Sequence, residues 1–188
     1  MRNLQPKRAF FIFALPFLLW GSVAGAAKFD FYLGGFDFTA ETNADKGSVN
    51  GVGAYKLGYY LPLFHNFEAG IGYSLIMSDT FSGDAAFGFD IEGAYYPFTS
   101  SGAIEVRTDR VSAIYNPLWK PFVMIGYHAR QFQSVSTQYN GFGVGIGTER
   151  VLTARYNLKG LLRYATLAGA NDGKATETVI LIGLTFNL

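Results

Sequence analysis

Hydrophobic and polar side chains alternate along most of this chain with a period of two. Runs of about ten residues follow this pattern, and clusters of Gly, Asn, Asp, Ser and Thr separate them. From Phe67 to Met77, the odd positions are all apolar, whereas the even positions are Glu, Gly, Gly, Ser and Ile. Successive side chains of a strand point to opposite faces. Each run therefore predicts a β-strand with one apolar face and one polar or glycine-rich face.

Eight such runs follow one another along the sequence. They cover residues 29–39, 52–61, 67–77, 87–95, 123–130, 142–149, 158–164 and 179–188. In the first run we expect a bulge at Gly34-Gly35, where the parity of the alternation slips.

The distribution of charges indicates how these strands are arranged. Almost every charge within a run shares its face with glycines, whereas the opposite face carries aromatic and branched side chains. A soluble lipocalin-type barrel has the reverse distribution, with an apolar interior. A glycine-rich polar face suits a narrow lumen, and runs of about 9–11 residues match the length of a tilted membrane-crossing strand. Because an open sheet edge in hydrocarbon would leave backbone groups unpaired, we predict an all-β fold. Its expected form is an eight-stranded antiparallel transmembrane up-and-down β-barrel, and an exported soluble β-sandwich is the alternative.

The N-terminus has the features of a secretory signal peptide. Basic side chains precede an apolar run over residues 9–20, and Ala24-Gly25-Ala26 then supplies small residues at the spacing that signal peptidase recognises. The apolar run contains a proline and is shorter than the ~20 residues of a membrane-spanning helix. We therefore expect cleavage before Ala27, with a signal peptide at 1–26 and an outer-membrane barrel domain at 27–188.

The connections between the predicted strands orient the barrel. Short segments at 61–66 and 152–155 fit tight periplasmic turns. Longer segments fit outer loops at 40–50, 78–86, 132–140 and 167–176. The periplasmic connection at 99–118 is unusually long, but its alternating pieces are too short to cross a bilayer. We expect a short helix or ribbon below the barrel there.

Composition narrows the possible functions. The chain has no cysteine, which excludes a disulfide scaffold, Cys-ligated metals and a thiol nucleophile. The hydrophobic fraction of 49% excludes disorder. A net charge of +1 gives no reason to expect nucleic acid. The sequence holds no metal, phosphate or dinucleotide motif, so we expect neither a metal site nor a cofactor.

Two kinds of segment resemble a known family. Residues 56–60, 67–73 and 120–127 look like hairpins of the small OmpA/OmpX-type outer-membrane barrels of Gram-negative bacteria. At the C-terminus, Gly183 is followed at three and five residues by Phe186 and Leu188, which is similar to the outer-membrane assembly signal. The last residue is Leu where Phe is usual, and Leu181 stands where a polar residue is common.

The resemblance also implies partners. They are outer-membrane lipids and lipopolysaccharide, periplasmic chaperones and the barrel assembly machinery, and the sequence indicates no external ligand. No peptidoglycan-binding domain follows the last predicted strand, so we do not expect the anchoring role of full-length OmpA proteins.

Charges on the predicted lumen face form the candidate site. Buried charges of both signs must pair, so we expect a plug of ion pairs. Glu149 and Lys159 should lie close together because their strands form a hairpin. Nearer mid-barrel, three acidic residues should meet two basic ones: Glu68, Asp90 and Glu92 with Lys56 and Arg163. The candidate lumen residues are Lys56, Glu68, Asp90, Glu92, His128, Arg130, Glu149, Lys159 and Arg163.

Three functions fit such a barrel. We favour a non-enzymatic envelope or surface-interaction protein with a plugged lumen over a narrow channel or small-molecule transporter. The third is a lipid A acyl-modifying enzyme, because some deacylases and palmitoyltransferases are small outer-membrane barrels. Their chemistry needs a Ser activated by a His, and the deacylase pattern puts that Ser two residues after the His. Here position 130 is Arg, Ser134 and Ser136 follow in a loop, and His65 falls in a predicted turn. We expect His128 to join the lumen network instead.

Overall fold

The computed structural model describes residues 27–41, 46–64, 66–77, 85–98, 104–107, 112–115, 119–132, 138–169 and 173–188. The expected signal peptide at 1–26 lies outside the described residues, as do His65, Ser134 and Ser136.

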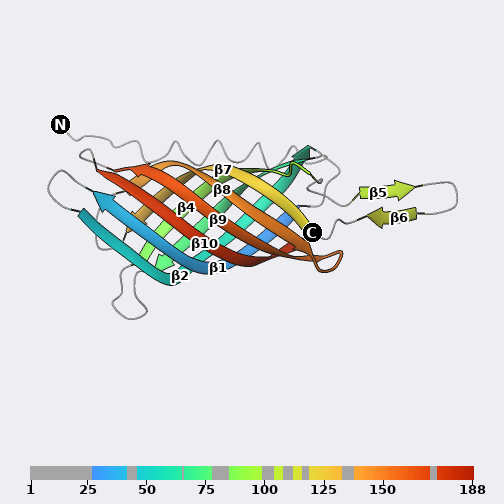
Figure 1. The fold of residues 1–188 in the computed structure, drawn as a ribbon, viewed down its shortest axis with the longest axis horizontal. Helices are drawn as coiled ribbons and strands as arrows, with labels where there is room; N and C mark the ends of the chain where they lie inside the picture. The colour runs from blue at the N-terminus through green and yellow to red at the C-terminus, as the bar shows by residue number, and fades with distance from the viewer. Residues whose placement is uncertain are drawn as a thin grey trace, which may run out of the picture.

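Eight strands close into one antiparallel barrel, which confirms the predicted fold class (Figure 1). The barrel strands are β1 (Lys28–Glu41), β2 (Lys46–Phe64), β3 (Phe67–Met77), β4 (Ala85–Tyr95), β7 (Trp119–Phe132), β8 (Gln138–Val151), β9 (Tyr156–Ala168) and β10 (Lys174–Asn187). Each pairs with the next barrel strand along the chain, and β1 pairs with β10 to close the sheet. We call the end that carries Lys28 and Leu188 the termini end, and the opposite end the loop end.

The described part of the long connection between β4 and β7 contains a two-stranded ribbon. Strands β5 (Ile104–Arg107) and β6 (Ser112–Tyr115) pair with each other and with no barrel strand. The ribbon extends beyond the termini end of the barrel (Figure 1). Of the two forms expected for this segment, the structure shows the ribbon.

The strands are longer than the alternation predicted. β2 has 19 residues, and β1, β7, β8 and β10 have 14 each. Strand residues consequently extend into both ends of the predicted outer loops at 40–50, 132–140 and 167–176. Ladder pairing continues where the outward side chains become polar, as at the Thr39 and Thr176 pair. The alternation between an apolar and a polar face is lost there, so the sequence pattern predicted strands that end too early.

The expected bulge lies on the other strand. Buried positions continue on even residues through β1, from Lys28 to Phe38, so its parity does not slip at Gly34-Gly35. The register instead passes from Gly34 opposite Ala54 to Phe36 opposite Gly51, which places the extra residue on β2. A β-bulge leaves one residue unpaired on the bulged strand only. Gly34-Gly35 therefore predicted the position of the bulge along the barrel correctly, but the bulge lies on β2 and not on β1.

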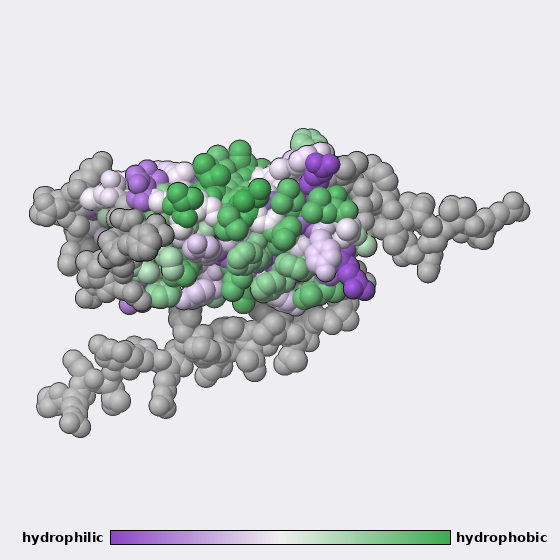
Figure 2. Space-filling view, turned by 90° about the horizontal axis from the view of Figure 1, so that it is seen from below, coloured by the Kyte–Doolittle hydropathy of each residue, from purple (hydrophilic) through white to green (hydrophobic). Residues whose placement is uncertain are grey.

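The outer wall of the barrel carries an apolar belt. Outward-facing Ile71, Ile146 and Ile182 are 49%, 61% and 52% exposed. Figure 2 shows apolar side chains across the middle of the wall, with polar side chains toward both ends. Among the described residues no helix is both long and apolar enough to cross a bilayer.

Candidate functional site: the lumen charge network

The lumen is filled by charged side chains. Among the described residues, six acidic and six basic side chains are buried there, together with His128. The acidic residues are Asp30, Glu68, Asp90, Glu92, Glu149 and Glu177, and the basic residues are Lys28, Lys56, Lys120, Arg130, Lys159 and Arg163. With neutral His128, the buried formal charges balance.

Glycines on the lumen face make space for these side chains. A Cβ atom at Gly143 would lie 2.7 Å from Nε2 of His128, and one at Gly126 would lie 2.8 Å from Cγ of Glu92. Any larger residue at these positions would overlap the network. The glycine-rich face seen in the sequence is thus the face that gives the long charged side chains their room.

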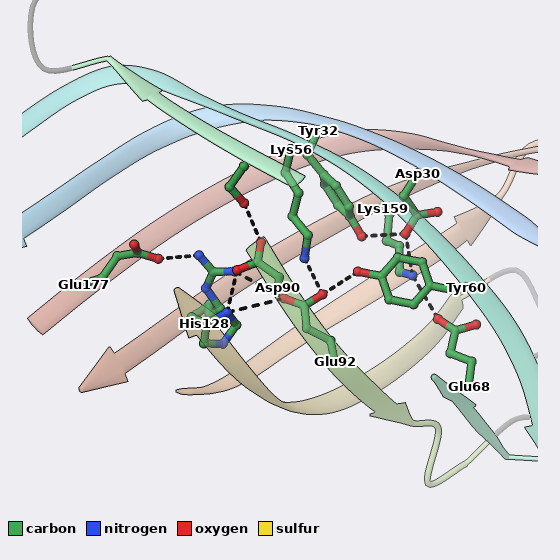
Figure 3. A network of polar contacts seen from close by, with 12 residues as sticks. Asp30, Tyr32, Lys56, Tyr60, Glu68, Asp90, Glu92, His128, Lys159 and Glu177 are labelled. Carbon is green, nitrogen blue, oxygen red and sulfur yellow. Dashed lines mark hydrogen bonds and ion pairs between the residues drawn. The ribbon is translucent and has the colours of Figure 1, made fainter. Parts of the chain in front are cut away.

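One group of contacts lies in the middle of the barrel, and we call it the mid-barrel cluster (Figure 3). Its members are Lys56, Asp90, Glu92, His128, Arg130, Arg163 and Glu177. Arg130 donates from Nη1 to Oδ1 of Asp90 at 2.8 Å and from Nη2 to Oε1 of Glu177 at 3.0 Å. Its Nε also donates to Glu177, so this guanidinium holds one carboxylate in a fork and reaches a second.

Arg163 and Lys56 complete the mid-barrel cluster. Nη1 of Arg163 lies 3.2 Å from Oε1 of Glu92 and 3.7 Å from Oδ1 of Asp90, and its Nη2 donates to Glu177. Nζ of Lys56 donates to Oε2 of Glu92. Arg163 therefore contacts all three carboxylates of the cluster.

A second group lies toward the termini end, and we call it the termini-end cluster. It consists of Lys28, Asp30, Glu68, Glu149 and Lys159. Nζ of Lys28 lies 2.9 Å from Oε2 of Glu68 and 3.3 Å from Oε2 of Glu149. Nζ of Lys159 donates to Oδ2 of Asp30 at 3.0 Å and to Oε1 of Glu68 at 3.1 Å.

Several of these pairs cross the lumen. In the closed strand order, β9 and β3 stand on opposite sides of the barrel, and Lys159 joins Glu68 between them. Tyrosines connect the two clusters: Tyr60 donates its hydroxyl to Glu92, and Nζ of Lys159 lies 4.9 Å from the centre of the Tyr60 ring. The network thus braces strands that are not neighbours in the sheet.

Aromatic rings fill the lumen at the loop end. Phe38 on β1 and Phe132 on β7 belong to opposite strands, and their ring centres are 4.7 Å apart. Tyr139 lies 5.5 Å from Phe38 and 6.5 Å from Phe132. We call these three buried residues the ring cluster, and they span the lumen beyond the charges.

The structure places all nine candidate lumen residues in the interior. Glu149 and Lys159 are register partners, and their charged atoms are 4.0 Å apart. Asp90 and Glu92 contact Arg163, and Glu92 contacts Lys56. Glu68 does not join them: it contacts Lys28 and Lys159 at the termini end. The strands are tilted and cross-lumen pairing depends on their stagger, which alternation along one strand does not reveal.

Sequence reasoning missed four lumen charges. They are Lys28, Asp30, Lys120 and Glu177. The alternation could have identified two of them. Lys120 lies on the same even positions as Met124 and His128, and Asp30 alternates with the outward Phe29 and Phe31. Glu177 fell outside because the last strand was expected to begin at 179, whereas β10 begins at Lys174.

The C-terminal residues named from the family resemblance belong to β10 or directly follow it. Gly183 faces the lumen beside the Tyr32 ring. Phe186 packs against Tyr156, with the ring centres 5.4 Å apart, and Leu188 is 70% exposed.

The side chains around His128 include three possible metal ligands. Ligand atoms of Asp90, Glu92 and His128 lie within 4.8 Å of one another, a group that the sequence did not suggest. Guanidinium nitrogens of Arg130 and Arg163 already contact these carboxylates, so a metal ion would meet two fixed cations.

The same side chains do not form a Ser-His-acid triad. Ser74 donates to Oδ2 of Asp90, and Nδ1 of His128 lies 2.8 Å from Oδ1 of the same carboxylate. A nucleophilic Ser must be hydrogen-bonded to the imidazole that removes its proton. In this arrangement the serine contacts the carboxylate, so the order of the three groups is unsuited to acyl chemistry.

The closed up-and-down barrel, its apolar belt and its polar lumen define the fold class of small outer-membrane β-barrels. The chain is similar to Neisserial surface protein A, with a TM-score of 0.59, 11% identity, and coverage of 86% of this chain and 97% of that one. It is also similar to the N-terminal β-barrel domain of OprF from Pseudomonas aeruginosa, with a TM-score of 0.51, 14% identity, and coverage of 87% and 99%. The outer membrane protease OmpT from Escherichia coli matches with a TM-score of 0.51 and 8% identity, over 87% and 97% of the two chains.

At these identities the likeness shows the fold. No protein-family model matches the chain, and no curated protein matches its sequence.

Proposed function

We propose that this chain is an integral outer-membrane protein that acts without catalysis, as an envelope or surface-interaction protein with a closed lumen. The apolar belt supports insertion into a bilayer, because an exposed apolar surface of this extent would be unfavourable in water. The three proteins of similar fold are named as outer-membrane or surface proteins or as a barrel domain. Outer-membrane lipids and lipopolysaccharide would surround the belt.

The functional part of this proposal depends on a closed lumen. Ion pairs join opposite strands at the termini end and non-neighbouring strands mid-barrel, and the ring cluster spans the loop end. A barrel of eight strands is just wide enough for side chains to fill its interior. Function would then reside on the outer surface and at the loop end, where strands extend past the apolar belt.

A narrow channel or small-molecule transporter is the second candidate. It is favoured by the polar groups that follow one another through the lumen, from Lys28 through Lys159 and Tyr60 to Glu92 and Arg163. Such a path would conduct only if these pairs separated and the ring cluster also moved.

Planar-bilayer conductance of the refolded full chain tests the proposal. Heat-modifiable migration on a gel would first establish that the barrel is folded, and the heat-denatured sample is the matched control. We expect no steady conductance from the folded protein. A stable open pore in repeated insertions would overturn the closed-lumen proposal and favour transport.

A further inference from the structure

Three buried oxygen atoms without hydrogen-bond partners lie in one row of the lumen wall. Within the described part of the chain, they are Oδ1 of Asp30 on β1, Oγ1 of Thr185 on β10 and Oδ1 of Asn157 on β9. Asp30 is the register partner of Thr185, and Thr185 is the partner of Asn157. Their exposed fractions are 1%, 0% and 2%. We call these three side chains the oxygen row.

The surrounding contacts leave these oxygens without donors. Tyr32 and Lys159 both donate to the other carboxylate oxygen of Asp30, Oδ2. Asn157 donates from Nδ2 to Oε1 of Glu149, which fixes the orientation of its amide and leaves its oxygen free. The Thr185 hydroxyl supplies the single proton of the row, so the row cannot satisfy both acceptors by itself. A buried acceptor without a partner is costly, which points to an additional ligand.

The charges around the oxygen row favour a cation as that ligand. In the termini-end cluster, three carboxylates contact only two ammonium groups, whereas the mid-barrel cluster holds three carboxylates and three permanent cations. Lys120 is buried and is the register partner of Glu149, yet it lies within 4 Å of no carboxylate among the described residues. Carboxylate, amide and hydroxyl oxygens are ligands of hard cations.

We propose that the oxygen row binds a small, singly charged hard cation of the sodium type. A single charge is favoured because a divalent ion would add more positive charge near Lys28, Lys159 and the buried Lys120. The row lies just inside the last register pair at the termini end, Lys28 with Asn187, so the ion would enter from that end. This inference goes beyond the proposed function and does not depend on whether the lumen conducts.

Sodium-dependent stability of the refolded full chain provides the test. Its unfolding midpoint in detergent micelles would be measured in sodium chloride and in choline chloride at equal ionic strength, so that screening is the same. Choline is too large for a buried row of three oxygens. A ligand that binds only the folded state raises the folding constant about a hundredfold at a hundred times its Kd. We therefore expect a midpoint that rises with sodium and saturates, and stays lower in choline.

A matched pair of variants locates the effect. Thr185→Val removes one oxygen from the row with little change of shape, and Thr178→Val makes the same change on the outward face of β10. We expect Thr185→Val to abolish most of the sodium-specific increase and Thr178→Val to retain it. A sodium effect that survives in Thr185→Val would overturn the site.

Two further results would also overturn the proposal. Equal midpoints in sodium and choline would mean that the row holds no sodium ion. A Thr185→Val midpoint that falls equally in both salts would assign the row to a buried water or to packing. Should Thr185→Val fail to fold, ²³Na line broadening by the unmodified barrel replaces it, and broadening that does not saturate would reject the site.

Discussion

Removing Arg163 tests whether the mid-barrel cluster is dry and paired. Its guanidinium contacts Asp90, Glu92 and Glu177, and its side chain is 2% exposed. In Arg163→Ala, three buried carboxylates would share only Lys56 and Arg130 as permanent cations. The cluster would then hold one uncompensated negative charge in a confined interior.

The magnitude depends on whether water reaches the remaining carboxylates. Removing one side of a buried pair costs ~3–5 kcal/mol, because the other charge stays desolvated. With a urea dependence of about 2 kcal/mol per molar, a loss of ~4 kcal/mol lowers the urea midpoint by about 2 M. If water filled the lumen, the same change would cost only ~0–1 kcal/mol.

The assay is urea unfolding of the refolded barrel, with Arg155→Ala as the control. Arg155 lies exposed in the turn between β8 and β9, so its removal should leave the midpoint unchanged. Adding Glu177→Gln to Arg163→Ala restores equal numbers of carboxylates and permanent cations in the cluster and should recover part of the loss. An unchanged midpoint for Arg163→Ala, with conductance already present in the unmodified protein, would refute the closed-lumen reasoning.

Further substitutions test the outer wall, the ring cluster and the last strand. Ile182→Arg places a cation on the apolar belt, and it should cost ~2–4 kcal/mol of stability and give less heat-modifiable barrel. Thr178→Arg, near the loop end, should cost only ~0–1 kcal/mol. Equal tolerance of the two changes would count against the assigned faces. Phe132→Ala removes one ring of the cluster and should cost ~3–5 kcal/mol in urea unfolding; a loss below 1 kcal/mol would mean that the rings do not pack as described. Deleting residues 186–188 should leave exported chain in the periplasm in fractionation experiments, and normal membrane assembly would contradict an assembly role for these residues.

Alternation revealed the faces of the strands because it is a property of each strand alone. Every second residue of a paired strand faces the lumen, so residues such as Lys56 and Glu149 could be placed inside from the sequence. Which residues pair across the lumen is not a property of a single strand. It depends on the tilt and stagger of the whole barrel, and Glu68 accordingly reaches Lys28 and Lys159 where the sequence suggested Lys56 or Arg163.

The predicted strand ends and the predicted position of the bulge were wrong for a related reason. Past the apolar belt the outward side chains become polar while backbone pairing continues, as at Thr39 with Thr176, so an apolar outer face no longer marks the strand. Around the bulge, β2 reads Asn50-Gly51-Val52-Gly53, and glycines on both sides hide the change of parity. The position of the extra residue is therefore fixed by pairing with β1, which the sequence pattern of one strand does not contain.

The two ends of the lumen are filled by different side chains, which bears on how the barrel could open. At the termini end and mid-barrel the closure is made of ion pairs, which water or salt could loosen if it gained access. At the loop end it is made of the rings of Phe38, Phe132 and Tyr139, which contact strands from opposite sides and gain nothing from hydration. Loosening the charges alone would therefore hydrate a lumen that stays closed at the loop end. Conduction would need both closures to fail together, and this supports a closed envelope protein over a channel gated by its charges.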